Sequence, residues 1–153
     1  MDIGSRFSYP ANALSNLAPH SFTIDGVRCA SMEGFLQSLK FKSVRIQRQV
    51  CTLMGLTAKR RGNSHNAFWQ RLLVLWWHGK AYDRFGQDYQ QLLDRAFAAL
   101  AGNPGFRKAL LATNGDDLTH SIGLHAQSVT VLTESEFCSR LMEIRERLRS
   151  MGP

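Results

Sequence analysis

Apolar and polar residues follow a helical period over much of the chain. In residues 87–100 the apolar side chains recur every three or four positions, which predicts a helix that stops before Gly102. A further helix is expected over 104–112, with a proline in its first turn. Thr133 and Glu136 have the spacing of a capping box, which predicts the start of the last helix.

The N-terminal half is predicted to contain a hairpin followed by helices. Residues 21–29 alternate around Asp25–Gly26, a dipeptide typical of two-residue hairpin turns. The first twenty residues contain two prolines and little periodicity, and we expect them to form an ordered loop. The three helices that follow the hairpin are expected over 31–42, 43–54 and 57–61.

An aromatic segment and a polar C-terminal stretch complete the pattern. Residues 67–78 include Trp69, Trp76 and Trp77 and run up to Gly79, which predicts one mostly buried helix that ends at this glycine. The remaining elements are a turn over 61–66, a polar loop over 113–117, and short strands over 118–122 and 129–132.

The elements predict one mainly α (α+β) domain over residues 1–153, long enough to bury about two thirds of its unfolded surface. No apolar stretch approaches the ~20 residues of a membrane span, and the N-terminus lacks the pattern of a secretory signal. Cys29, Cys51 and Cys138 lie far apart, without a Cys-x-x-Cys motif. We therefore expect a cytoplasmic protein with buried thiols, without a metal site or a cofactor.

The net charge of +7, from nineteen basic and twelve acidic residues, favours polyanionic partners such as nucleotides or nucleic acid. The basic residues are spread along the chain, with local density at Arg45/Arg48, at 59–61 and in the last helix. A solvated basic surface without a specific partner would explain the same charge.

A polar stripe on the first predicted helix is the leading candidate for chemistry. Glu33, Gln37 and Lys40 stand at i, i+4 and i+7 and share one face of a helix whose other residues are largely apolar. Such a stripe suits the wall of a pocket. A simpler alternative is that the negative charge of Glu33 only stabilises the N-terminus of the helix and that Lys40 is a surface lysine.

Other candidates also have simpler explanations. His120 has the chemistry of a proton shuttle, but a lone histidine is more often structural. Asp116 lies in a loop where aspartates commonly serve the turn. A tryptophan facing a cleft would stack on a base or nicotinamide ring, although most tryptophans are core residues. Phosphate-binding loops, nucleophile elbows and zinc-protease motifs are absent from the sequence.

Several short motifs in collinear order resemble those of the YbiA-like or NADAR (NAD and ADP-ribose) superfamily over residues 7–125. They are Leu14-Ser-Asn16, Phe22 with the Asp-Gly turn, Ser31-Met-Glu33-x6-Lys40-Phe41, Arg60-Arg-Gly62, Trp69, Arg84-Phe85 and Leu110-Leu-Ala-Thr-x-Gly-Asp116. Their joint order, more than any single motif, carries the resemblance.

The resemblance implies a compact, mostly helical fold with a few short strands and cleavage of N-glycosidic bonds on ribose phosphates. Some members act on phosphoribosyl-aminopyrimidine intermediates of riboflavin synthesis, and others remove ADP-ribose from guanine in DNA. It further implies that Glu33 is catalytic and that Trp69 contacts a base or ribose. The substrate-binding set that we expect from the whole sequence is Asn16, Lys40, Trp69 and Asp116.

The chain departs from the riboflavin subgroup after the Thr-x-Gly-Asp loop. Members of that subgroup continue with an acidic residue and an Asp-x-x-Trp-Gly element, whereas this chain reads Leu118-Thr-His-Ser-Ile-Gly-Leu-His125. The second carboxylate therefore has no counterpart here, and His120 is the expected replacement as a second catalytic residue.

Three hypotheses follow. The first is an ADP-ribosyl-guanine hydrolase acting on nucleic acid or on a free ADP-ribose conjugate. The second is a glycosidase for riboflavin intermediates, and the third is a non-catalytic module that binds ADP-ribose or NAD. The expected partners are a nucleotide-type small molecule and ADP-ribosylated DNA, with no membrane, and a monomer is compatible with all three hypotheses.

Overall fold

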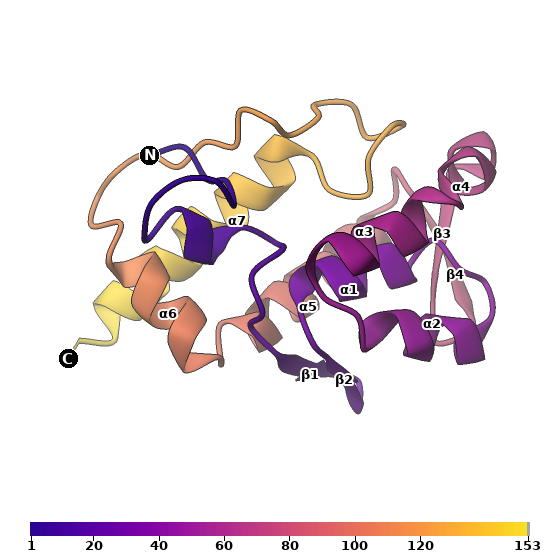
Figure 1. Ribbon diagram of the computed structural model, residues 1–153, viewed down its shortest axis with the longest axis horizontal. Coiled ribbons are helices and arrows are strands. Elements are labelled where there is room, and N and C mark those ends of the chain that lie inside the picture. Colours follow the sequence, from indigo (N-terminus) through magenta and orange to yellow (C-terminus); the bar gives the residue numbers. More distant parts are fainter. Residues whose placement is uncertain (153) are drawn as a thin grey trace.

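Seven α-helices and two small antiparallel sheets build the protein, as described for residues 1–152 of a computed structural model (Figure 1). The helices are α1 (Met32–Ser38), α2 (Val44–Cys51), α3 (Gly55–Asn63), α4 (Asn66–Leu72), α5 (Gln87–Leu100), α6 (Pro104–Leu111) and α7 (Glu134–Ser150). The strands are β1 (Phe22–Ile24), β2 (Val27–Cys29), β3 (Val74–Trp77) and β4 (Lys80–Asp83), and a 3-10 turn, η1, covers Asn12–Leu14. The mainly α (α+β) fold is therefore confirmed.

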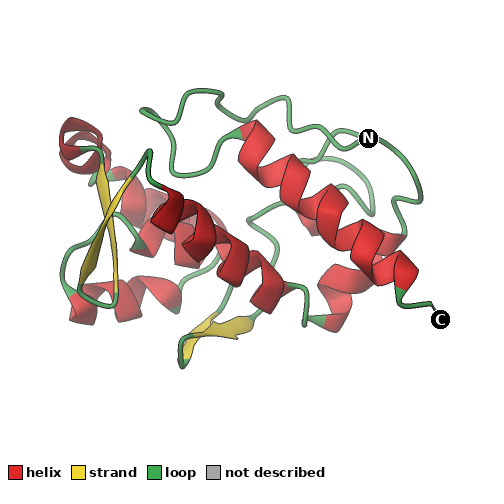
Figure 2. Ribbon diagram, turned by 180° about the vertical axis from the view of Figure 1, so that it is seen from behind, coloured by secondary structure: helices red, strands yellow, loops and turns green. Residues whose placement is uncertain are grey.

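The elements form two groups that are joined by α5 (Figures 1 and 2). One group holds α1 to α4 and the β3–β4 hairpin, and within it α1 packs against both α2 and α3. The other group holds α6, α7 and the N-terminal segment. Helix α5 contacts β4 in the first group and α7 in the second. No helix within residues 1–152 has the length and apolar character needed to cross a membrane.

The N-terminal hairpin forms where the Asp-Gly pair predicts it. Strands β1 and β2 pair antiparallel, with Phe22 opposite Cys29. Asp25 and Gly26 both adopt positive φ, 49° and 78°, as a two-residue turn of this kind requires. The Asp25 carboxylate also accepts a hydrogen bond from Trp77 Nε1 at 2.8 Å, which fastens the turn to β3.

Helix α1 begins as predicted but ends earlier than the apolar pattern suggests. Ser31 caps it by accepting a hydrogen bond from Gly34 N at 3.0 Å. After Ser38 the bonds tighten to the i+3 type, and the Leu39 carbonyl accepts from Trp76 N of β3 at 2.9 Å. Because this carbonyl bonds to a distant strand, the α-helical ladder does not continue to residue 42.

Gly34 allows α1 to approach the C-terminal end of α2 closely. A Cβ atom at this position would lie 2.5 Å from the Leu53 carbonyl oxygen and 3.2 Å from that of Val50. Both neighbours are backbone atoms and cannot rotate away. The helix that carries Glu33 is thus positioned by a contact that only glycine permits.

We expect Gly34→Ala to lower the free energy of unfolding by about 1–3 kcal/mol, because the added methyl group forces the two segments apart. Urea denaturation measures the change. Gly115→Ala is the matched control, since its Cβ would meet nothing closer than 3.8 Å. A change within about 0.5 kcal/mol is expected there. Equal stability of the two variants would contradict the close contact at Gly34.

The single helix predicted over 67–78 is wrong. Helix α4 ends at Leu72, Leu73 takes a left-handed conformation with φ of 53°, and Val74–Trp77 form a strand. Gly79 therefore ends no helix but completes a hairpin turn to β4, with φ of 79°. A continuous apolar run is compatible with a buried helix or a buried strand, and its period alone cannot separate them.

The predicted strands over 118–122 and 129–132 are also absent, and among residues 118–132 only Thr119 forms an isolated bridge, with Asp2. Backbone hydrogen bonds at Thr119 and Leu124, together with two side-chain anchors, hold this segment in place of a sheet. Tyr89 Oη donates to the Val131 carbonyl at 2.6 Å, and Arg84 Nε donates to the Thr130 carbonyl at 2.9 Å. Farther along the chain, the capping box at Thr133 and Glu136 is confirmed at the start of α7. The short helix expected over 57–61 is longer, as α3, and takes up part of the turn expected over 61–66.

Candidate active site

A cavity of about 250 Å³ lies between the α1, α3 and α4 group and the loop that precedes α7. Its wall combines residues from the loop before β1, these three helices, residues 120–132 and the first turn of α7. Ligand pockets commonly measure about 300–1,000 Å³, so this cavity is slightly smaller than that range. It has room for one sugar-sized part of a larger ligand, with the remainder at the mouth.

Glu33 is the only carboxylate among the described residues that line the cavity. It lies in the first turn of α1, where its backbone N–H donates to the Asn16 carbonyl at 3.0 Å. Its Oε1 accepts a hydrogen bond from Gln37 Nε2 at 2.7 Å. The predicted i, i+4 stripe thus exists as a hydrogen-bonded pair that fixes the carboxylate.

Gln37 is itself fixed by α3. A Cβ atom at Gly62 would lie 1.7 Å from Gln37 Oε1 and 2.8 Å from Gln37 Cβ, so only glycine permits this approach of the helices. Gln37 Oε1 has no hydrogen-bond partner among the described residues. The position of this oxygen is explained by its contact with the Gly62 backbone, because a carbonyl oxygen also packs favourably against a Cα–H group. Gly62 therefore supports the orientation of Glu33 through Gln37.

Lys40 is a buried cation at the cavity wall. Its side chain is only 5% exposed, and its ammonium donates to Asn66 Oδ1 at 2.6 Å. No carboxylate within residues 1–152 lies at ion-pair distance from it. Burial lowers the pKa of Lys40 from 10.5 to about 8, an effect that Glu33 opposes and nearby Lys59 reinforces. The site thus holds a partly compensated positive charge.

Trp69 contributes an unused donor. It lines the cavity and is fully buried, yet its indole Nε1 has no hydrogen-bond partner among residues 1–152. A buried N–H without a partner costs free energy, and native proteins normally satisfy such groups with protein, water or ligand. The tryptophan belongs to α4 and not to a helix shared with Trp76 and Trp77, which lie on β3.

His120 reaches the cavity from the loop after Leu118. Its Nδ1 lies 2.9 Å from the Ile3 carbonyl oxygen, which can only accept, so Nδ1 carries the proton. Its backbone N–H donates to Glu134, and its ring packs edge-on against Phe137 with the centroids 5.3 Å apart. Nε2 makes no hydrogen bond within residues 1–152. In the neutral ring it is a free acceptor, and in the imidazolium form it is a free donor.

Residues 120–132 add an apolar rim to the cavity mouth. Ile122, Leu124 and Val129 line the cavity and are 74%, 52% and 45% exposed. Such side chains would become covered when a ligand ring or another apolar group lies across the mouth. The sequence offered no local signal for this rim, because its position depends on the anchors from Arg84 and Tyr89.

The structure brings five of the six predicted site residues to one cavity, namely Asn16, Glu33, Lys40, Trp69 and His120. Asp116 is the exception. It is exposed and outside the cavity lining, and its backbone carbonyl accepts a hydrogen bond from Arg145 of α7 at 2.8 Å. Its loop therefore fastens α7, and we remove Asp116 from the candidate site.

Three polar residues were missed at the sequence level: Lys59, Asn63 and Asn66 line the same cavity from α3 and α4. The pattern placed two of them in a turn, where asparagine is common and carries no chemical signal. Within residues 1–152, no three His, Cys, Asp or Glu side chains gather in an arrangement that would hold a metal ion.

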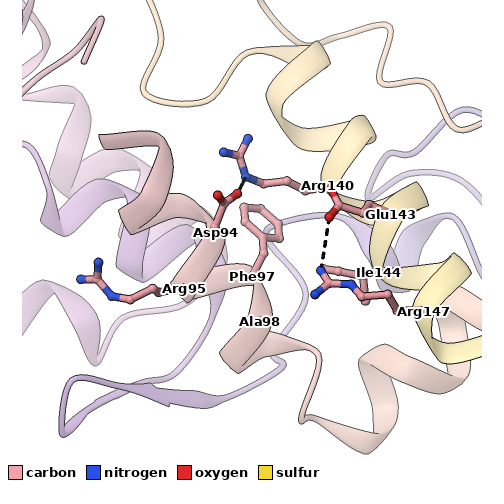
Figure 3. Close-up of a pocket in the computed structure, with 8 residues that line it drawn as sticks. All are labelled: Asp94, Arg95, Phe97, Ala98, Arg140, Glu143, Ile144 and Arg147. Carbon is pink, nitrogen blue, oxygen red and sulfur yellow. Dashed lines mark hydrogen bonds and ion pairs between the residues drawn. The ribbon is translucent and has the colours of Figure 1, made fainter. Parts of the chain in front are cut away.

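A second cleft lies between α5 and α7, and its charged residues are largely paired with one another (Figure 3). Arg140 meets Asp94 at 2.9 Å, and Arg147 meets Glu143 at 3.8 Å. Arg95 pairs with Asp25 of the hairpin turn at 3.1 Å. This cleft lacks the buried, unpaired polar groups of the first cavity, which is the better candidate site.

Comparisons with known proteins agree with this architecture. Residues 8–146 match the family described as bacteriophage protein GP30.3. The chain is 40% identical over 151 residues to an uncharacterised 17.1 kDa protein in the Gp30–rIII intergenic region of Enterobacteria phage T4, covering 97% of this chain and 98% of that protein. The NMR structure of Escherichia coli YbiA matches with a TM-score of 0.59 and 19% identity, over 94% of this chain and 82% of YbiA. The last comparison shows a shared YbiA-like fold.

Proposed function

The chain belongs to the bacteriophage protein GP30.3 family and has the fold of YbiA, and from this premise we propose that it is an N-glycosidase. Its substrate is an ADP-ribose-type compound, either ADP-ribosyl-guanine in nucleic acid or a free ADP-ribose conjugate, whose C1′–N bond is hydrolysed. The observation that carries the proposal is the Glu33 carboxylate, held by Gln37 at the wall of a cavity that Lys40 and Trp69 also line.

The reaction requires one carboxylate near C1′. As the C1′–N bond breaks, positive charge develops on the ribose ring, and an adjacent carboxylate stabilises it. Glu33 fills this role and accepts a proton from the water whose oxygen bonds to C1′. The leaving nitrogen takes a proton from His120 Nε2, in the imidazolium form that keeps Nδ1 bonded to Ile3. The products are the free ribose hydroxyl and the protonated base.

The remaining residues bind the substrate. Trp69 Nε1 donates to a substrate oxygen, and Asn16 holds the ribose hydroxyls beside the start of α1. The Lys40 ammonium forms an ion pair with a substrate phosphate, and Lys59 adds a second, exposed cation at the same cavity. The substrate oxygen would satisfy Trp69 Nε1, the one buried side-chain donor that has no partner among residues 1–152.

Binding of ADP-ribose is expected to weaken about tenfold as the pH rises from 7 to 9. Lys40 titrates at about pH 8, so its ammonium is mostly present below that pH and mostly lost above it. Calorimetry at pH 7, 8 and 9 measures the change. The matched variant Lys40→Arg retains its charge and is expected to show a flat profile. An unchanged affinity in the wild type would contradict phosphate binding by Lys40.

A binding module without catalysis is the second candidate, because the described cavity lining holds one carboxylate where many glycosidases use two. Hydrolysis of phosphoribosyl-aminopyrimidine compounds is a third. The missing Asp-x-x-Trp-Gly element argues against it, since this chain has no tryptophan after Trp77.

Incubation with an oligonucleotide that carries ADP-ribosyl-guanine, followed by chromatographic detection of free ADP-ribose, tests the proposal. Release of ADP-ribose supports the glycosidase. Calorimetric binding of ADP-ribose without release identifies the module. Release of the base from a phosphoribosyl-aminopyrimidine, but not from the oligonucleotide, identifies the third activity. Absence of both binding and release would overturn the assignment of this cavity.

A further inference from the structure

The basic residues are spread along the chain but the acidic residues are not, so the net positive charge falls in one continuous segment. Residues 34–82 contain nine Lys and Arg and no Asp or Glu, which gives this segment a charge of +9. The rest of the chain has ten basic and twelve acidic residues, a net charge of −2. The excess charge of the whole protein therefore comes from α1 to α4 and the β3–β4 hairpin.

The fold keeps this segment together. Helices α2 and α3 both pack on α1 and contact each other, and they lie on the near face in Figure 1, with α5 on the far side as Figure 2 shows. We call Arg45 and Arg48 of α2 with Lys59 and Arg60 of α3 the basic surface. All four side chains are exposed, and Arg45 and Arg48 share one face of their helix at i and i+3.

The cations of the basic surface have no carboxylate partner within residues 1–152. The arginines of the α5–α7 cleft, in contrast, are paired. Arg140 meets Asp94 and Arg147 meets Glu143 (Figure 3), and Arg95 meets Asp25. Lys80, in the same acid-free segment, pairs with Asp88 beyond it. Because the charges of the basic surface are not neutralised internally, they produce a field that attracts a polyanion.

The basic surface and the candidate active site share a residue. Lys59 belongs to both, and Asn63 and Asn66 extend the cavity wall from the C-terminal end of α3 into α4. We propose that α2 and α3 form a docking surface for the phosphate backbone of a nucleic acid whose modified nucleotide enters the cavity.

The opposite chemistry of the two sides of the mouth favours a nucleic acid over other polyanions. Lys59, Asn63 and Asn66 come from α3 and α4, whereas the exposed Ile122, Leu124 and Val129 come from the loop before α7. A nucleotide chain presents phosphates on one side and flat bases on the other, which matches this division. An acidic homopolymer such as polyglutamate has no flat apolar groups of this kind. The identity of the entering nucleotide rests on the proposed function, whereas the docking surface does not.

Fluorescence anisotropy with a labelled, unmodified 20-mer, single-stranded and duplex, tests the surface separately from catalysis. The triple variant Arg45→Gln, Arg48→Gln, Arg60→Gln is expected to bind at least tenfold more weakly than wild type. The slope of log K against log salt should fall by about two for the single strand. The matched control Arg107→Gln, Lys108→Gln, Arg149→Gln removes three exposed charges outside residues 34–82 and is expected to stay within twofold of wild type.

Three results would overturn the docking surface. They are equal weakening by the two triple variants, absence of binding by the wild type, and equally tight binding of polyglutamate. If the wild type binds the unmodified 20-mer but fails to hydrolyse any ADP-ribosyl substrate, the surface stands and the proposed function fails. If the wild type hydrolyses a free ADP-ribose conjugate but does not bind the 20-mer, the proposed function stands and the surface fails.

Discussion

Glu33→Gln is expected to lower hydrolysis of an ADP-ribosyl-guanine substrate at least a hundredfold, while the affinity for ADP-ribose stays within about threefold. The amide matches the carboxylate in size but neither stabilises the positive charge that develops at C1′ nor accepts a proton from water. Gln37 Nε2 can still donate to the new side-chain oxygen, so the local structure is retained. Rates of ADP-ribose release under saturating substrate, with calorimetry in parallel, separate chemistry from binding.

The matched control for this variant is Glu143→Gln. Glu143 lies in the α5–α7 cleft and is exposed, and its partner among residues 1–152 is Arg147, at 3.8 Å (Figure 3). Its replacement is expected to leave turnover unchanged. If Glu33→Gln retained most of the wild-type turnover, the catalytic assignment would be lost, and Glu33 would be reduced to supporting the start of α1.

The largest effect on stability is expected at Arg84, whose replacement by methionine should lower the free energy of unfolding by about 3–5 kcal/mol. Arg84 is fully buried and forms a two-pronged pair with Glu136, at 2.7 and 3.1 Å. Removal of the guanidinium leaves a buried carboxylate without its charge partner. Arg84 also holds the Thr130 carbonyl, so the loop wall of the cavity loses an anchor at the same time.

Urea denaturation at pH 7 measures this effect, with Arg147→Gln as the control. Arg147 forms an exposed pair with Glu143, and its loss is expected to cost about 0–1 kcal/mol. A loss at Arg84 as small as that of the control would contradict a structural role for the buried pair. A functional readout accompanies the measurement, because a loosened loop should also weaken ADP-ribose binding.

The Arg84–Glu136 ion pair also predicts that the protein loses stability at acidic pH. Burial raises the pKa of Glu136, but hydrogen bonds from Arg84, Thr133 and Gln90 prevail and lower it from 4.5 to about 2. The folded state therefore binds fewer protons than the unfolded state between these values. The stabilisation is fully present above about pH 4.5 and is lost as the pH falls through about 2. Over this range the wild type should lose more stability than Arg84→Met.

The position of the candidate site was largely predictable, whereas its boundary was not. Glu33, Gln37 and Lys40 could be grouped because neighbours at i+4 and i+7 follow from helix geometry alone. Lys40 in fact lies just beyond the end of α1, yet it still lines the same cavity. Asp116 looked equivalent to these residues in the sequence but lies outside the cavity, since its loop is drawn to Arg145 of α7.

The sequence by itself determined those features that depend on contacts between near neighbours. The Asp25–Gly26 turn, the caps at Ser31 and Thr133, and the apolar stripe of α5 each follow from a few adjacent residues. It also determined the concentration of positive charge in residues 34–82, which is a property of composition.

The tertiary structure alone decided which apolar segments became strands and which residues closed the cavity. Val74–Trp77 is a strand because it pairs with β4 and because Trp76 N bonds to the Leu39 carbonyl at the end of α1. The orientation of Glu33 depends in turn on Gly62, which lies on another helix. Contacts of this kind join residues that are far apart in the chain, and their free energy is gained only when the whole core assembles. No local pattern of residues predicts these long-range contacts.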